Sequence, residues 1–209
     1  MPPAEPESES LPARIQARLA RLYGLSEGPS VDDFIEASDH DDREVLVIVD
    51  RGGEGEVELS LRLPRAAASG HPSFDQLCQI VEGVSHFLYV VERARRELPA
   101  TQLELELQAE VDKYVLLAHG PALAAEPGRF EAGRAARIRR TLFDRVSYVD
   151  PAGTETGDRY RFANDLAAGF AARLEKRFAR HGRFEQMRAA LRRFYCAGQA
   201  EKIELARAA

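Results

Sequence analysis

The chain has 209 residues, of which 44% are hydrophobic, and it carries a formal net charge of −5. This apolar content is enough for a sizeable core and excludes a wholly disordered chain. No stretch approaches the roughly 18 uninterrupted apolar residues of a membrane span, and the Pro-, Glu- and Ser-rich start does not resemble a signal peptide. We therefore expect a cytoplasmic bacterial protein with no membrane partner.

The two halves of the chain differ in charge. Residues 129–209 contain 18 Arg and Lys against 10 Asp and Glu, whereas residues 1–128 contain 11 and 24. Such a contrast indicates either an anionic partner for the basic half or attraction between two halves of one fold. Solvated faces are the usual place for such charges, so the contrast alone does not require a partner.

The first 10 residues are expected to form a disordered leader. Leu11, Ile15, Leu19 and Leu22 then repeat at helical spacing, and Gly24 is a plausible end to that helix. A short helical turn capped by Ser30 is expected next, and the polar residues 39–42 are expected to form a loop.

Residues 44–63 show the clearest strand pattern. A run of aliphatic residues over 45–49 precedes a Gly-rich turn, after which Val57, Leu59, Leu61 and Leu63 alternate with polar residues. This pattern predicts an antiparallel β-hairpin with one apolar face, which must pack on helices because an isolated hairpin is marginal in water.

The segment from Ser73 to about Leu98 is predicted to be the central helix. Ser73 and Gln76 match a capping box, and the apolar residues that follow fall on one wide arc of a helical wheel. A second capping box, Thr101 with Glu104, begins the next segment, whose alternating leucines fit a strand while its residue types fit a helix. We predict a helix over 101–118, ending near Gly120, and leave a strand open as the alternative.

Three further helices are expected in the basic half. They cover residues 131–146, a segment with i+4 apolar spacing from Phe162 to Phe178, and a last stripe from Phe184 to Tyr195. The weak pattern of residues 199–209 predicts a poorly ordered tail.

Together these patterns predict an α+β fold, mainly helical, with five or six helices packed against the hairpin. Residues 11–198 are expected to form a single globular domain, with a sub-boundary near 120–130 as the alternative.

The first candidate site consists of Glu82, His86 and Glu110. Glu82 and His86 lie four residues apart on the central helix, so their side chains point the same way. Inward Glu and His side chains hold metals or transfer protons in helical bundles. The chain contains no ExxH pair, however, and a buried hydrogen bond between Glu82 and His86 is the simpler interpretation.

A second set of residues suggests ion pairs between the halves. Arg173 and Arg177 fall inside the apolar arc of their helix, and Glu106, Glu110 and Glu82 are acidic residues that could pair with them. We expect one or two such pairs to hold the two halves together.

The helix over 131–146 carries the third candidate. Arg134, Arg137 and Arg140, with Arg139, give it a basic face suited to a phosphate backbone or another anion. The acidic balance of the whole chain and the lack of a nucleic-acid-binding motif speak against this reading.

No motif indicates a cofactor, a phosphate loop or a nucleophilic cysteine. The patterns therefore favour a protein-interaction, regulatory or adaptor domain without catalytic activity, which binds a protein partner or a second copy of itself. A helical enzyme or metal-binding protein that uses Glu82, His86 and Glu110 is the first alternative, and a nucleic-acid-binding protein is the second.

Overall fold

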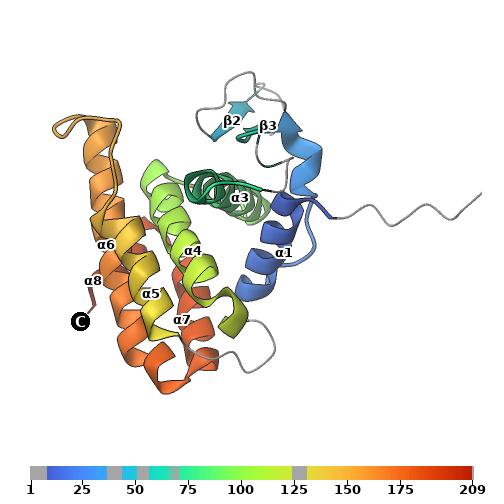
Figure 1. Ribbon diagram of the computed structural model, residues 1–209. Coiled ribbons are helices and arrows are strands. Elements are labelled where there is room, and N and C mark those ends of the chain that lie inside the picture. The colour runs from blue at the N-terminus through green and yellow to red at the C-terminus, as the bar shows by residue number, and fades with distance from the viewer. Residues whose placement is uncertain are drawn as a thin grey trace, which may run out of the picture.

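The computed structural model describes residues 9–36, 44–50, 57–65, 67, 71–123 and 131–208. These residues form a mostly helical α+β fold, with a small sheet at one end of a helical body (Figure 1). The α-helices of these ranges are α1 (Leu11–Tyr23), α3 (Phe74–Arg95), α4 (Gln102–Leu123), α5 (Ala132–Arg139), α6 (Glu155–Arg177), α7 (Phe184–Cys196) and α8 (Gln199–Arg207). No helix in the described part of the chain is long and apolar enough to cross a membrane.

The sheet contains three strands, in the order β1 (Ile35–Glu36), β3 (Val57–Arg62) and β2 (Val45–Asp50). β2 and β3 pair antiparallel, as predicted, while the turn predicted between them lies outside the described residues. β1 was not predicted: it follows the short 3-10 helix Val31–Phe34 and pairs parallel with β3. Two residues are too few to show an alternating pattern, which is why β1 was missed. Because β1 pairs parallel and β2 pairs antiparallel with β3, the sheet is mixed rather than a simple hairpin.

The apolar face of β3 packs on α3. Leu61 and Leu63 are buried there, and Gly83 of α3 makes the close approach possible. A β-carbon at position 83 would lie 2.7 Å from Leu63 Cδ2, so any other residue there would force the Leu63 side chain to move. The predicted packing of strands on this helix is therefore present.

Capping residues explain where α1 begins and ends and where α3 begins. Ser10 Oγ accepts from the amide of Ala13, and Gly24 ends α1 with a left-handed φ of 67°. The predicted capping box of Ser73 and Gln76 begins α3, which ends at Arg95, three residues earlier than expected.

Helix α4 is the central helix of the fold, whereas the sequence predicted α3 to be the central one. It contacts α3, α5, α6, α7 and α8, and it continues to Leu123, beyond the expected end near Gly120. The alternating leucines belong to a helix that is buried on several sides, which is why the pattern resembled a strand. Six polar residues of this helix are also buried: Glu104, Glu106, Gln108, Asp112, Lys113 and His119.

The basic half packs around α4. The predicted helix over 131–146 is α5 followed by a π-helical turn, Arg140–Asp144. Helix α6 begins at Glu155, seven residues before the apolar spacing that starts at Phe162. Residues 199–207 form α8 rather than a poorly ordered tail, and Lys202 on it is fully buried.

Candidate metal centre between helices α3 and α4

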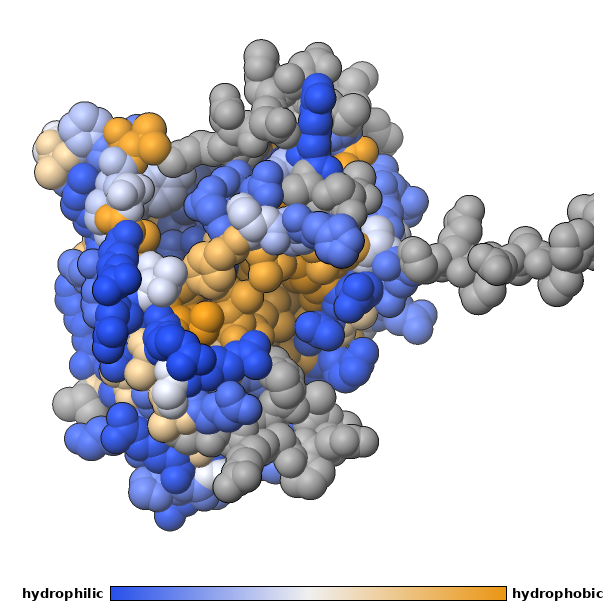
Figure 2. Space-filling view, viewed as in Figure 1, coloured by the Kyte–Doolittle hydropathy of each residue, from blue (hydrophilic) through white to orange (hydrophobic). Residues whose placement is uncertain are grey.

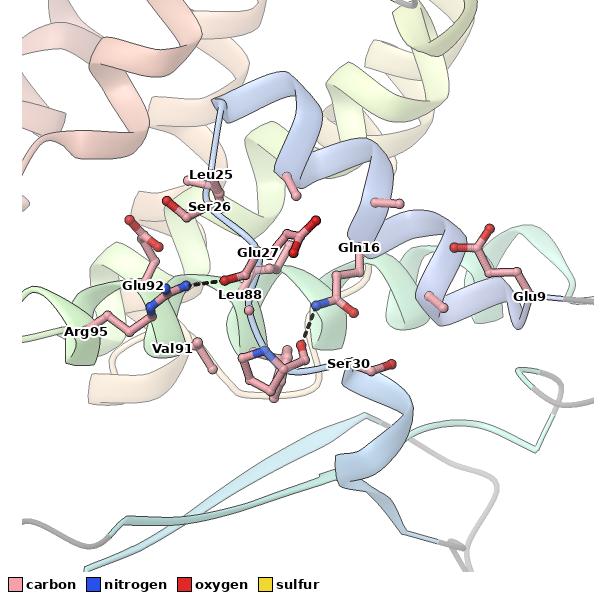
Figure 3. Close-up of a pocket in the computed structure, with 16 residues that line it drawn as sticks. Glu9, Gln16, Leu25, Ser26, Glu27, Ser30, Leu88, Val91, Glu92 and Arg95 are labelled. Carbon is pink, nitrogen blue, oxygen red and sulfur yellow. Dashed lines mark hydrogen bonds between the residues drawn. The ribbon is translucent and has the colours of Figure 1, made fainter.

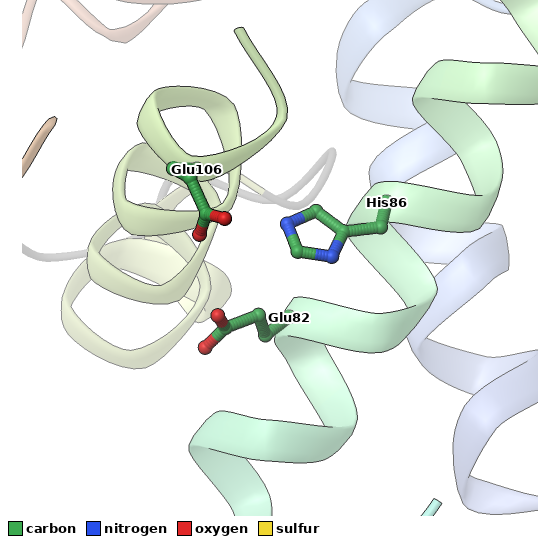
Figure 4. A group of neighbouring side chains, drawn as sticks. All are labelled: Glu82, His86 and Glu106. Atoms are coloured by element: carbon green, nitrogen blue, oxygen red, sulfur yellow. The ribbon is translucent and has the colours of Figure 1, made fainter. Parts of the chain in front are cut away.

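Two neighbouring helices each bring a pair of polar side chains to the same place. Glu82 and His86 lie four residues apart on α3, and Glu106 and Glu110 lie four residues apart on α4, so each pair occupies one face of its helix. One ligand atom from each of Glu82, His86 and Glu106 lies within 4.8 Å of the other two. The imidazole of His86 points between the two carboxylates, as Figure 4 shows.

Protein surrounds these three side chains because α4 is central to the fold. His86 is 8% exposed and Glu106 is 5% exposed, and Glu44, next to the start of β2, lies 3.9 Å from His86 Nδ1 through its Oε1 atom. We call Glu44, Glu82, His86, Glu106, Glu110 and Lys113 the acidic cluster.

Lys113 supplies a positive charge inside the acidic cluster. Its Nζ donates to Glu82 Oε2 over 2.9 Å and to Glu110 Oε1 over 2.8 Å. The lysine side chain is 9% exposed, so the pairing takes place away from solvent, where an unpaired charge is costly.

The single ammonium does not bond every polar atom of the acidic cluster. His86 Nε2, Glu44 Oε2 and Glu110 Oε2 are buried and have no hydrogen-bond partner among the described residues. Buried polar atoms normally have partners, and an unpartnered one needs an explanation such as a bound ion. Here three such atoms lie in one cluster.

Burial shifts the protonation of the acidic cluster. It raises the pKa of Glu106 to about 8, with the nearby charge of Glu82 adding to the effect. Burial also raises the pKa values of Glu44 and Glu110. For Glu82, burial alone would raise the pKa, but Lys113 and His86 outweigh it and lower the value.

Burial lowers the pKa of His86 and so favours the neutral imidazole, although the charge of Glu82 and a hydrogen bond with the Leu105 backbone act in the opposite direction. A neutral imidazole with a free nitrogen and ionised carboxylates are the forms that bind a metal ion. Two carboxylates and one imidazole form a donor set that Zn²⁺ and similar divalent transition ions accept, with open positions for water or a ligand. Ligand atoms around one such ion stand roughly 3.4 Å apart, so shifts of about 1 Å would bring the three side chains into range.

A cavity of about 550 Å³ reaches the acidic cluster. Its lining includes Glu44, Glu82, Glu110 and Lys113 of the acidic cluster, together with other polar residues such as Asp75 and Arg145 and apolar ones such as Phe74, Val146 and Val149. Since Glu82 belongs both to this lining and to the group of three possible ligands, a metal ion bound there would be close to the cavity.

A second cavity, of about 360 Å³, lies between α1 and α3 (Figure 3). Its polar side chains hold loop backbone: Gln16 donates to the Pro29 carbonyl, and Arg95 donates to the Glu27 carbonyl. These contacts fasten the connection after α1, so we assign this cavity a structural role.

A second buried polar cluster uses other faces of the same helices. Asp112 accepts hydrogen bonds from Tyr23, from Ser85 over 2.6 Å and from Gln108 over 2.9 Å. Lys202 donates to Gln108 Oε1 over 2.6 Å and to a backbone carbonyl of α7 over 2.8 Å. We call these five residues the Asp112 network. It joins α8, α4, α3 and α1, and sequence reasoning missed it.

The structure rearranges the first predicted site. Glu82 and His86 lie together as expected, but Glu106 completes the group of three, and Glu110 bonds Lys113 instead. Glu106 was predicted to pair with an arginine of the basic half, and the charge of Arg159 on α6 does lower its pKa, although burial and Glu82 outweigh that effect. The spacing of four residues between Glu106 and Glu110 could have indicated that both side chains lie on one face of α4. The leucines on both sides of Glu106 made this polar face hard to recognise.

The predicted ion pairs of Arg173 take a different form. Arg173 donates to the carbonyls of Leu205 and Ala206 on α8, while Glu82 and Glu110 pair with Lys113 of the acidic half. Arg177 is exposed near the end of α6. Contacts that join the halves include Tyr114 to Glu175, at 2.6 Å, and Lys202 to Gln108.

The basic face of α5 is only partly free. Arg134 is half-buried and donates to the Leu117 carbonyl, and Arg139 lies 3.4 Å from Glu175. Arg137 and Arg140 are exposed. The two exposed arginines form a smaller basic surface than the predicted face of four arginines.

Hydrophobic residues gather in a hollow on the face formed by α1, α3 and α4, within a hydrophilic border (Figure 2).

Comparison of this chain with protein-family models, with curated proteins and with solved structures finds no match.

Proposed function

We propose that this protein binds one divalent transition-metal ion through Glu82, His86 and Glu106. The observation that carries the proposal is the buried, unpartnered Nε2 of His86 beside two carboxylates on facing helices. A neutral imidazole donor and carboxylate oxygens suit Zn²⁺, Fe²⁺ or Mn²⁺. The carboxylate of Glu82 has two oxygens and can therefore contact both Lys113 and the ion.

Metal binding explains why carboxylates are gathered in a buried place. An ion with two positive charges would allow Glu106 to ionise at neutral pH, where burial otherwise favours its protonated form. The cavity beside Glu82 would give a ligand access to the positions that the protein leaves open on the ion.

Calorimetric titration of the metal-free protein with Co²⁺ and Zn²⁺ tests this proposal. We expect one ion per chain, and an affinity loss of about 100-fold or more in Glu82→Gln, His86→Gln and Glu106→Gln, since even outer-shell partners of a metal contribute roughly 10- to 100-fold.

Glu92→Gln is the matched control, because Glu92 lies on the same helix but pairs with Arg96. It should leave the metal affinity unchanged. Equal affinity in all four variants and the unchanged protein would contradict the proposal.

A second candidate function is association with a protein partner or with another copy of the chain. It is favoured by the apolar hollow over α1, α3 and α4, since contiguous apolar surface on a soluble protein often marks an interface (Figure 2). Sedimentation over a range of protein concentrations tests self-association, and a constant monomer mass would exclude it.

A further inference from the structure

The cavity beside the acidic cluster has buried charged residues in its lining, and its exposed lining combines apolar residues with polar ones such as Asp75 and Arg145. The side chains of Glu82, Glu110 and Lys113 are 18%, 16% and 9% exposed. Phe74, Val146 and Val149 line the same cavity but are 41%, 38% and 69% exposed. Glu82, Glu110 and Lys113 therefore form the inner end, and the three apolar residues form one part of a mixed rim.

The apolar part of the rim is a concentration of exposed hydrophobic residues. Within the described ranges the exposed large hydrophobic residues are Val45, Phe74, Leu98, Val146 and Val149. Three of these five line this one cavity, although they come from the start of α3 and from the segment between the π-helical turn and α6. Single exposed apolar residues need no explanation, but a group around a concave site is typical of ligand binding.

The size of the cavity suits a small molecule. Its volume of about 550 Å³ lies within the range of small-molecule sites. Tyr148 and Tyr160 also line it, and each combines an aromatic surface with a hydroxyl group.

The inner end favours an oxygen donor once an ion is bound. The ion would offset the charges of Glu82 and Glu106, while Lys113 stays paired with Glu110. A group that reaches the ion from the cavity would then meet cations, and oxygen donors such as carboxylate or hydroxamate suit both an ammonium and a divalent ion.

From this arrangement we infer that the cavity binds a small amphipathic ligand. Its oxygen-donor group coordinates the metal ion, and its apolar body contacts Phe74, Val146 and Val149. The inference rests on the proposed function, because the ion provides the anchor.

Two hydroxamates of different chain length test the inference. Acetohydroxamate and octanohydroxamate carry the same donor group, and each is titrated by calorimetry into the Co²⁺-loaded protein. Octanohydroxamate should bind about tenfold or more tightly, because each buried methylene adds favourable transfer free energy.

Exposed positions provide the variants, so folding is not at risk. Phe74→Ser and Val149→Ser should remove most of the difference between the two hydroxamates and leave Co²⁺ affinity unchanged. Leu98→Ser is the matched control, since Leu98 is 43% exposed but lies outside the cavity lining, and it should keep the difference.

The outcomes separate the two proposals. Bound Co²⁺ with equal affinity for both hydroxamates, or a preference that persists in Phe74→Ser and Val149→Ser, overturns the amphipathic ligand alone. Absence of Co²⁺ binding overturns the metal site and the ligand together.

Discussion

Helices α3 and α4 carry two buried polar clusters, and the clusters differ in how completely their atoms are bonded. In the Asp112 network the carboxylate accepts three hydrogen bonds, and Lys202 donates two. In the acidic cluster an imidazole nitrogen and two carboxylate oxygens have no partner among the described residues. A fully bonded cluster stabilises a fold, whereas an incompletely bonded one suggests a missing ligand.

The contrast is sharpest at two consecutive residues of α3. Ser85 belongs to the Asp112 network and donates to its carboxylate, while His86 belongs to the acidic cluster. Successive helical residues point about 100° apart, so one helix can serve a structural and a functional cluster at the same height.

The largest effect is expected at the centre of the Asp112 network. Asp112→Ala leaves the hydroxyls of Tyr23 and Ser85 and the amide of Gln108 without their acceptor. We expect a loss of about 3–5 kcal/mol in the free energy of unfolding, measured with urea, because breaking a buried polar network leaves its members unpaired. A loss below about 1 kcal/mol would mean that this network is not structural.

Lys113→Gln should destabilise the metal-free protein by about 2–4 kcal/mol, since Glu82 and Glu110 lose their shared cation. Saturating Zn²⁺ should recover a large part of this loss by supplying another cation. Thermal unfolding with and without Zn²⁺ measures both effects. Arg145→Gln, which changes an exposed cation of the same cavity, should show neither. A loss that Zn²⁺ does not reduce would count against an ion in the acidic cluster.

The neighbouring pair on α3 gives a smaller but more specific contrast. Ser85→Ala should cost about 1–2 kcal/mol of stability, the usual range for a buried hydrogen bond, and leave Zn²⁺ affinity unchanged. His86→Gln should change the stability of the metal-free protein less and reduce Zn²⁺ affinity strongly. Urea unfolding and calorimetry on both variants provide the comparison, and the reverse pattern would exchange the roles assigned to the two clusters.

The smallest expected effect is a slope of stability with pH. Because folding raises the pKa of Glu106 from 4.5 to about 8, the folded metal-free protein holds a proton that the unfolded chain has lost over this range. Its stability should therefore fall as the pH rises from about 4.5 to 8. Metal affinity should rise over the same range, because the ion binds the ionised carboxylate. Glu106→Gln should reduce the stability slope, with Glu44 and Glu110 keeping part of it because burial also raises their pKa values, and parallel slopes in both proteins would show that Glu106 does not contribute.

Local signals in the sequence predict much of the fold. The caps at Ser73 and Thr101 and the left-handed Gly24 begin or end helices where expected, because these interactions involve residues close together in the chain. The strand β1 and the helix α8 were missed, since their stability comes from pairing with β3 and from burying Lys202 on α4.

The candidate site was predicted in part for the same reason. The i,i+4 spacing of Glu82 and His86 is a local feature, and it indicated the correct face of α3. The partner on α4 depends on how two helices pack, and a helix buried on many sides gives no single polar face to follow. Glu106 therefore resembled an acidic partner for an arginine.

Anomalous diffraction from crystals grown with Co²⁺ tests most directly the difference between the two clusters. We expect an anomalous peak about 2.0–2.2 Å from ligand atoms of Glu82, His86 and Glu106, and none within the Asp112 network. An ordered acidic cluster without a peak, or a peak held by other residues, would contradict the metal site.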